Sequence, residues 1–428
     1  MATRQWIFFA TICLLTVGVL IACGPETAPV TSTSSESQAL TDTPTVAMSD
    51  TVDLGVVPFL VGETTGGENR PGFNQSTVPV LDEISLTPYQ LVHTPEGTDS
   101  PVRSLFDWSP DGRYFLADRG SDEVIQIGSL GYGLADLYLG DANTGEVRLL
   151  QENAGWPSWS WDGHWIYYLT GMKDGDRPRY DLYRRSMETG DSVLVVADVG
   201  APGTEQAAVE ISDGRLLLLD RNYRAALFED GVITPLSALA GHAVPQDVIF
   251  ENYAVAPDGR TIAVFSPQAP LYLVDLDART LIDTVPVNID NHRPLAWSAD
   301  SRRFAFANRD GLFVYDRDTQ TISPIVTRKD LGMREEDVTA WFYGPIWSPN
   351  EDVLLFGAIN QDWEITRGWS NSSGIKFAVT ADGSHLRALS DATTLTLSRD
   401  KTHGLGSLWD KETWKSVRVL MIIEWRKQ

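Results

Sequence analysis

Few side chains in this chain of 428 residues are grouped in a way that supports catalysis. No Gly-x-Ser-x-Gly turn is present to expose a serine nucleophile, and no His-Glu-x-x-His segment to hold zinc. The acidic group Asp174, Asp176 and Asp181 offers carboxylates for calcium but lacks the ligand order of an EF-hand loop. The six histidines are far apart and have no ligand spacing; they stand at 93, 164, 242, 292, 385 and 403. We therefore expect no catalytic residue, no metal site and no cofactor.

The two cysteines, Cys13 and Cys23, belong to the N-terminal segment. Arg4 precedes an apolar run over residues 6–21, which is short for a membrane span of about 20 residues and suits a signal-peptide core. The run ends in Leu20-Ile21-Ala22-Cys23-Gly24, which resembles the lipobox of bacterial lipoproteins. That resemblance implies cleavage after residue 22 and a diacylglyceryl group on the thiol of Cys23. The alternative, an uncleaved anchor helix, would also tether the chain to a membrane.

The segment after Cys23 predicts a linker. Residues 24–50 are rich in Ser and Thr and contain no aromatic and no basic residue, so they cannot bury enough apolar surface to offset their ordering entropy. Residues 51–77 hold one apolar patch and a Gly-rich stretch, and we join them to the linker. The expected organisation is a signal peptide over 1–22, a lipidated linker over 23–77 and a folded domain over 78–428.

Composition limits the partners of that domain. Hydrophobic residues make up 43% of the chain, enough for a sizeable core, and 35 Gly with 23 Pro favour many turns. Against 34 Lys and Arg stand 58 Asp and Glu, a formal net charge of −24. A surface this acidic repels phosphate backbones, so we expect no nucleic-acid partner.

A short motif recurs along the domain. Trp108-Ser109-Pro110-Asp111-Gly112 has similar copies at 159–163, 256–260, 297–301 and 347–351, with weaker copies at 211–215 and 397–401. The Asp or Asn of these copies stands at 111, 162, 213, 258, 300, 350 and 400, at intervals of 42 to 51 residues. Short strands with a period of roughly 40–50 residues indicate the blades of a β-propeller.

The chemistry of the motif predicts a hairpin turn. Pro110 has the fixed φ that suits the second position of a type I turn, and Gly112 can take the positive φ that closes the turn. Continuous apolar runs follow each copy, for example at 165–169, 216–219 and 353–358. Because these runs do not alternate, both faces of each second strand should be buried, as between two neighbouring blades.

The repeats resemble the TolB-like, WD40-related propeller repeats of exported bacterial proteins, whose motif is a WSPDG turn followed by apolar strands. The resemblance covers about residues 100–428 and implies an all-β propeller of four-stranded blades. Copies at 301 and 351 depart from it, since Ser301 and Glu351 replace Gly. Dividing the 351 residues of 78–428 by about 48 predicts seven blades, with six as the alternative. The last repeat is short, so we expect Ile84–His93 to supply its outer strand and close the ring.

One face of the propeller is the expected recognition surface. The longest segments between second and third strands, at 119–135, 171–181 and 360–374, are predicted to be irregular loops on the same face. Arg and exposed aromatic residues dominate binding hot spots, so the candidate contacts in these segments are Tyr132, Arg177, Arg179, Tyr180, Trp363, Arg367 and Trp369.

Two functions remain open from the sequence. The favoured one is a membrane-anchored lipoprotein whose propeller is a non-catalytic binding or scaffold module for a protein, peptide or glycan. Its expected location is the bacterial cell envelope, with the domain exported to the periplasmic or extracellular side. The alternative is a propeller hydrolase or lyase acting on a sugar or peptide with carboxylate or His groups near the central channel.

Overall fold

A computed structural model describes the chain in segments. They are residues 60–61, 72–73, 78–93, 104–127, 130–174, 177–200, 206, 208–211, 213–239, 252–266, 269–287, 289, 295–333, 341–359, 375–390, 395–410 and 415–425. Cys23 and the whole predicted signal peptide lie outside them. Within the predicted linker, β1 (Leu60–Val61) pairs with β2 (Gly72–Phe73) in a two-stranded sheet. No helix of the described residues is long and apolar enough to cross a membrane.

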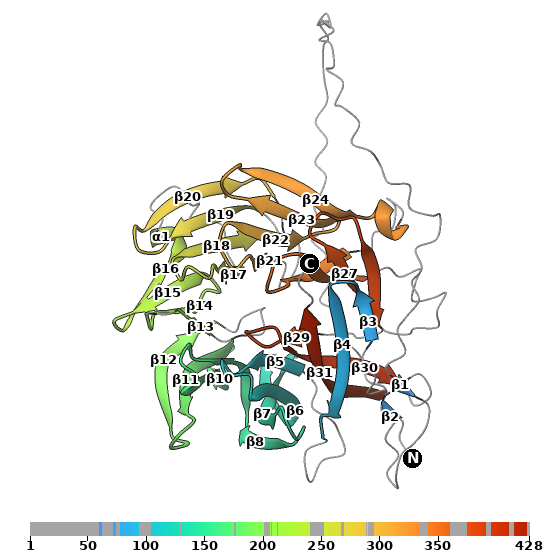
Figure 1. The fold of residues 1–428 in the computed structure, drawn as a ribbon. Coiled ribbons are helices and arrows are strands. Elements are labelled where there is room, and N and C mark those ends of the chain that lie inside the picture. Colours follow the sequence, from blue (N-terminus) through green and yellow to red (C-terminus); the bar gives the residue numbers. More distant parts are fainter. Residues whose placement is uncertain are drawn as a thin grey trace, which may run out of the picture. The chain divides into compact units, whose positions relative to one another are not determined.

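The described residues after position 77 form seven antiparallel sheets, which are the blades of a β-propeller (Figure 1). In chain order, the first blade consists of β5 (Ser104–Trp108), β6 (Tyr114–Ile127), β7 (Leu130–Asp141) and β8 (Val147–Gln151). The second consists of β9 (Ala154–Trp159), β10 (Trp165–Asp174), β11 (Arg177–Ser186) and β12 (Ser192–Val199). The third consists of β13 (Ala208–Glu210), β14 (Leu216–Leu219), β15 (Ala225–Glu229) and β16 (Val232–Pro235). The short helix α1 (Leu236–Leu239) follows the third.

The next three blades have the same strand order. The fourth consists of β17 (Asn252–Val255), β18 (Thr261–Ser266), β19 (Ala269–Asp275) and β20 (Thr280–Val285). The fifth consists of β21 (Leu295–Trp297), β22 (Arg303–Ala307), β23 (Gly311–Asp316) and β24 (Thr321–Thr327). The sixth consists of β25 (Trp341–Trp347), β26 (Val353–Ile359), β27 (Ile375–Thr380) and β28 (Leu386–Ser390). The 3-10 turn η2 (Lys329–Leu331) follows β24.

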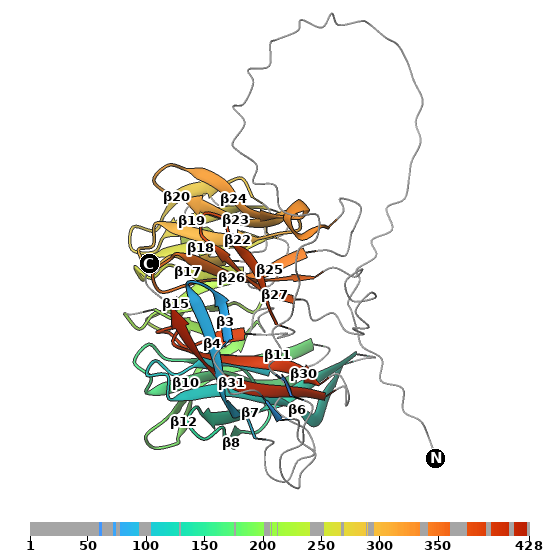
Figure 2. The ribbon, with the colours of Figure 1, turned by 45° about the vertical axis from the view of Figure 1, so that its right-hand side comes forward.

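The seventh blade, called the closing blade below, joins the two ends of the domain. It consists of β29 (Leu395–Leu397), β30 (His403–Asp410), β31 (Lys415–Trp425), β4 (Ile84–Leu91) and β3 (Val78–Leu81). β4 pairs with β31 from Ile84 opposite Trp425 to Leu91 opposite Val419 (Figures 1 and 2). This confirms that the segment at Ile84 supplies the missing outer strand, while the fifth strand, β3, was not expected.

The core lies between the blades rather than inside any one of them. Seven clusters of buried residues each combine two neighbouring blades, and together they link every blade to the next around the ring. β14 shows the principle: Leu216 and Leu218 pack toward β9–β12, whereas Leu217 and Leu219 pack toward β17–β20. Burial of second strands on both faces is therefore confirmed, and so is the count of seven blades rather than six.

The repeated motif forms the turn between first and second strands. Gly112 has φ 69° and Gly163 φ 74°, the left-handed conformation that was expected of them. The Ser109 hydroxyl donates to Asp111 Oδ1 at 2.5 Å and accepts the Tyr114 backbone N–H at 2.8 Å, so Ser and Asp satisfy the turn internally. Ser301 and Glu351 adopt the same left-handed φ, at 60° and 62°, without being glycine.

Two segments expected to be irregular loops are strands instead. Residues 119–127 and 130–135 continue β6 and β7, and residues 171–174 and 177–181 continue β10 and β11. Backbone pairing holds both hairpins together and does not depend on the side chains. Glycines interrupt 119–135 and charged residues interrupt 171–181, which is why the sequence suggested loops. The third segment, 360–374, lies outside the described residues.

Candidate functional site

Three neighbouring blades carry hairpins that project on the face of the second-to-third connections. β5 pairs with β6 only between Phe115 and Asp118, yet the β6–β7 ladder continues to Ile127 opposite Leu130. The β10–β11 ladder reaches Asp174 opposite Arg177, and the β30–β31 ladder reaches Asp410 opposite Lys415. At about 3.4 Å per residue, four residues beyond the first strand extend a hairpin by roughly 14 Å.

The three blades from β13 to β24 have short connections at the same place. Their second and third strands pair as far as Leu219 opposite Ala225, Ser266 opposite Ala269 and Ala307 opposite Leu312. The projecting hairpins of the closing blade, β5–β8 and β9–β12 are therefore gathered on one side of the ring. We call them the hairpin face.

Four of the predicted contact residues lie on the hairpin face. Tyr132 stands in β7 opposite Ile125, and Arg177 begins β11 opposite Asp174. Arg179 is one-third exposed, and its Nε donates to Asp181 Oδ1 at 3.0 Å. Tyr180 is only 4% exposed. Trp363, Arg367 and Trp369 lie outside the described residues.

The buried position of Tyr180 has a structural cause. Its ring packs edge-on against Trp156, with the ring centroids 5.6 Å apart, and its backbone pairs with Val199 of β12. Tyr180 thus belongs to the core shared with β13–β16 rather than to an exposed binding surface. The carboxylate of Asp181, also buried, accepts the Asp198 backbone N–H at 2.8 Å, so it orders the chain locally.

The opposite face carries the first-to-second and third-to-fourth turns, here called the turn face. Indole N–H groups of the repeated motif hold the turns to their neighbours: Trp108 donates to Thr396 O at 3.1 Å, Trp297 to Ala254 O at 3.1 Å and Trp347 to Ala296 O at 3.0 Å. In each case the acceptor belongs to the first strand of the preceding blade. These tryptophans are structural.

Two of the residues that replace the Gly of the motif, Ser301 and Glu351, also join blades. The Ser301 hydroxyl accepts the Asp258 backbone N–H at 2.9 Å. Glu351 Oε1 accepts the Ala299 backbone N–H at 2.6 Å, and its other oxygen pairs with Arg303. A side chain where the repeat has glycine therefore provides a hydrogen-bond acceptor between blades that offsets the strained φ.

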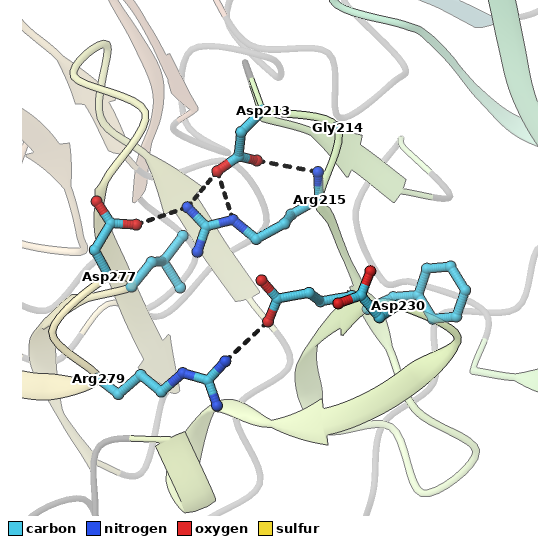
Figure 3. Close-up of a pocket in the computed structure, with 9 residues that line it drawn as sticks. Asp213, Gly214, Arg215, Asp230, Asp277 and Arg279 are labelled. Carbon is cyan, nitrogen blue, oxygen red and sulfur yellow. Dashed lines mark hydrogen bonds and ion pairs between the residues drawn. The ribbon is translucent and has the colours of Figure 1, made fainter.

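An open cavity of about 500 Å³ lies on the turn face between β13–β16 and β17–β20 (Figure 3). The turn that precedes β14 contributes Asp213 and Arg215, and the end of β15 contributes Glu229. Asp277 and Arg279 come from the turn between β19 and β20 of the next blade. This cavity was not predicted, because Arg215 and Asp277 are 62 positions apart and only the fold brings their turns together.

Ion pairs across the cavity satisfy most of its charges (Figure 3). Arg215 Nε donates to Asp213 Oδ2 at 2.6 Å, and its Nη2 reaches Asp277 Oδ1 at 2.8 Å. Arg279 Nη2 donates to Glu229 Oε2 at 2.9 Å. Burial alone would raise the pKa of Asp213, but hydrogen bonds from the side chain and backbone of Arg215 outweigh it and hold that pKa below its usual value. The cavity is therefore lined by a network that connects two blades.

The described residues offer little support for an enzymatic site. No group of three or more His, Cys, Asp or Glu among them is arranged to hold a metal ion. The pKa values of Asp111, Asp162 and Asp300 are lowered, first of all by the hydroxyl of the Ser two residues earlier. Because the same Ser–Asp hydrogen bond lowers the pKa in each of these turns, the shifts follow from the repeated turn and do not indicate a catalytic role.

Comparison with known proteins finds similarity among solved structures. No protein-family model matches the chain, and no curated protein sequence matches it. The crystal structure of TolB from Acinetobacter baumannii is similar, with 15% sequence identity and a TM-score of 0.36. The matched region covers 58% of this chain and 58% of the TolB chain, so it spans less than two thirds of either protein.

Arg215→Met should lower the free energy of unfolding by about 1 kcal/mol at pH 7, the usual limit for a partly exposed ion pair. The pKa of Asp213 is lowered in the folded state, so its contribution is present above its unfolded pKa and is lost as the pH falls through the folded value. The deficit of the variant should therefore shrink below about pH 4. Urea unfolding at pH 7 and pH 3 measures both effects.

Arg302→Met is the matched control. Arg302 is about half exposed, and its partners Asp316 and Asp318 belong to its own blade, so the expected loss is less than half that of Arg215→Met. Equal losses in the two variants, or a deficit for Arg215→Met that persists at pH 3, would contradict the account of the cavity.

Proposed function

We propose that this chain is a non-catalytic binding module, held at the bacterial cell envelope by a lipid on Cys23, and that the hairpin face engages its partner. The observation that carries the proposal is the projection of three hairpins from neighbouring blades while the corresponding connections in β13–β24 stay short. A propeller fold by itself requires no such extensions.

The position of the hairpins suits recognition. Their bases belong to sheets packed on both faces, so their direction is fixed, whereas their ends extend past the first strands into the surroundings. Binding residues are commonly found on such extensions of a rigid scaffold. Tyr132, Arg177 and Arg179 lie there and are of the residue types that dominate protein interfaces.

The anchor is proposed from the residues before the domain. A cleaved signal peptide would remove Cys13 and leave Cys23 as the N-terminal residue with its lipid. The linker over 24–77 would then separate the propeller from the membrane surface. Two or more acyl chains would hold the protein stably, since one chain alone binds only marginally.

Cys23→Ala should release the protein from membranes and abolish its labelling by a clickable fatty acid, because the thiol is the proposed site of attachment. Cell fractionation and in-gel detection of the label measure the two effects. Cys13→Ala is the control, since Cys13 lies in the apolar run and should change neither result. Membrane retention of an unlabelled Cys23→Ala chain would rule out the lipid anchor.

A photo-reactive amino acid at position 132 or 177 should crosslink one discrete partner in intact cells, because both positions lie on the hairpin face. The control position is 232, where Val232 is 60% exposed at the start of β16 on the turn face. The expected product is a band seen from 132 and 177 and absent from 232. The same band from all three positions, or none from either hairpin, would refute the proposed binding face.

A further inference from the structure

Two turns of the turn face carry side chains that the repeat does not require. The position before the Asp or Asn of the motif holds Trp161 in one copy and Arg399 in another. The other five copies have a small or turn-forming residue there: Pro110, Ser212, Pro257, Ala299 and Pro349. Because five copies form the same turn without a large side chain at this position, the turn itself does not explain the Trp and the Arg.

The fold brings these two residues together, although 238 positions separate them. Arg399 Cζ lies 5.0 Å from the centroid of the Trp161 ring, which is a cation–π contact. Its Nη1 donates to Trp161 O at 3.1 Å and its Nη2 to Ser160 O at 3.5 Å. Arg399 belongs to the closing blade and Trp161 to β9–β12, so the contact passes over the turn of the blade between them.

The first-to-second turn of β5–β8 lies between the turns that hold Trp161 and Arg399 and packs against both turns. A Cβ on Gly163 would lie 3.1 Å from Pro110 Cδ, and a Cβ on Gly112 would lie 4.0 Å from Ser398 Cβ. The three turns thus form one continuous surface at the ends of the first strands. Trp161 is 51% exposed there and is the only Trp classed as exposed among the side chains that the structure describes.

The indole of Trp161 is not needed to build this surface. The Trp161 backbone N–H donates to Glu210 Oε2 of the next blade at 2.7 Å, and Ala299 makes the same bond to Glu351 Oε1 at 2.6 Å. An alanine therefore suffices at this position in another blade. Exposing half of a large aromatic side chain is unusual for a turn and is typical of a residue that completes its burial against a partner.

The three turns carry carboxylates. Asp111, Asp162 and Asp400 occupy the three turns and are exposed. Each accepts the hydroxyl of its own turn's Ser through Oδ1, at 2.5, 2.7 and 2.6 Å, and Asp400 Oδ2 also accepts the Thr402 hydroxyl at 2.8 Å. The pKa of Asp162 is lowered by that hydroxyl and by the His164 backbone N–H, so the group is ionised at neutral pH. With Glu210, the four acids of this surface outnumber its three bases, Arg113, Arg399 and Lys401.

We propose that Trp161, Arg399 and the carboxylates of Asp111 and Asp162 form a second binding surface, on the turn face, for a basic segment of a partner protein. A Lys or Arg side chain of that segment stacks on the exposed part of the indole, as Arg399 does from within the chain, while the carboxylates neutralise its charge. The charge of the surface and the net charge of −24 select against acidic partners.

The test uses the full-length chain in detergent and a fluorescent eight-residue peptide of alternating Lys and Ser. Its dissociation constant is measured by anisotropy at low salt. Trp161→Ala and Asp162→Asn should each raise this constant at least fivefold, and Trp161→Phe should lie between the two proteins because a smaller ring attracts a cation less. A peptide of alternating Glu and Ser should not bind.

Two matched variants separate this surface from the general acidity of the chain. Asp191→Asn removes one exposed charge from the turn between β11 and β12, and Tyr223→Ala removes an aromatic side chain that is 43% exposed on the opposite face. Both should change the dissociation constant less than twofold. Melting curves of Trp161→Ala should match those of the unsubstituted protein, which excludes misfolding as the cause.

The proposal is overturned by any of three results. They are the absence of Lys-Ser peptide binding to the unsubstituted chain, a loss in Asp191→Asn as large as in Asp162→Asn, and an unchanged dissociation constant in Trp161→Ala. This surface is independent of the hairpin face, so its failure would leave the proposed function untouched.

Discussion

The second strands of the six blades from β5 to β28 carry apolar side chains on both faces, and the rest of the fold depends on covering both. Leu217 and Leu218 are adjacent in β14, yet they belong to cores shared with different neighbours. Burying such a side chain is worth about 1.5–3 kcal/mol, so a blade without one neighbour would expose several of them to water. No blade is stable alone, and the ring must close. β4 closes the ring by pairing with β31, from which it is separated by most of the chain.

The seven similar turns tolerate different residues because only some of their positions make the contacts that hold the ring together. In four turns a Ser hydroxyl and an Asp carboxylate satisfy the backbone locally, and the indole of several copies ties the turn to the preceding blade. Positions not needed for these contacts are free to vary. Ser301 and Glu351 use that freedom to add hydrogen bonds between blades, whereas Trp161 remains half exposed beside Arg399. Departures from a repeat therefore separate structural from functional side chains more clearly than the repeat itself does.

Much of the fold was predictable because its determinants are local and periodic. The turn chemistry at Pro110 and Gly112, the doubly apolar strands and the spacing of the copies led to seven blades and to an outer strand near Ile84. The hairpin extensions were not predictable, since glycines interrupt residues 119–135 and backbone pairing holds the hairpin together. Tyr180 was expected at an interface and is buried by Trp156, which is a neighbour only in the folded chain. The cavity at Arg215 and the Trp161–Arg399 contact likewise join residues that are distant in sequence.

The most direct test of closure is a disulfide between β4 and β31. Thr87 stands opposite Ile422 in the ladder, and a chain that starts after residue 23 contains no cysteine. In that chain, the two thiols of the Thr87→Cys, Ile422→Cys variant should form a disulfide readily when oxidant is added to the folded protein. They should stay reduced when the protein is first unfolded in urea and oxidant is added afterwards. The control pair Thr87→Cys with Val232→Cys joins different blades and should stay reduced. Equal crosslinking of both pairs, or none in the folded β4–β31 pair, would contradict a ring closed by β4.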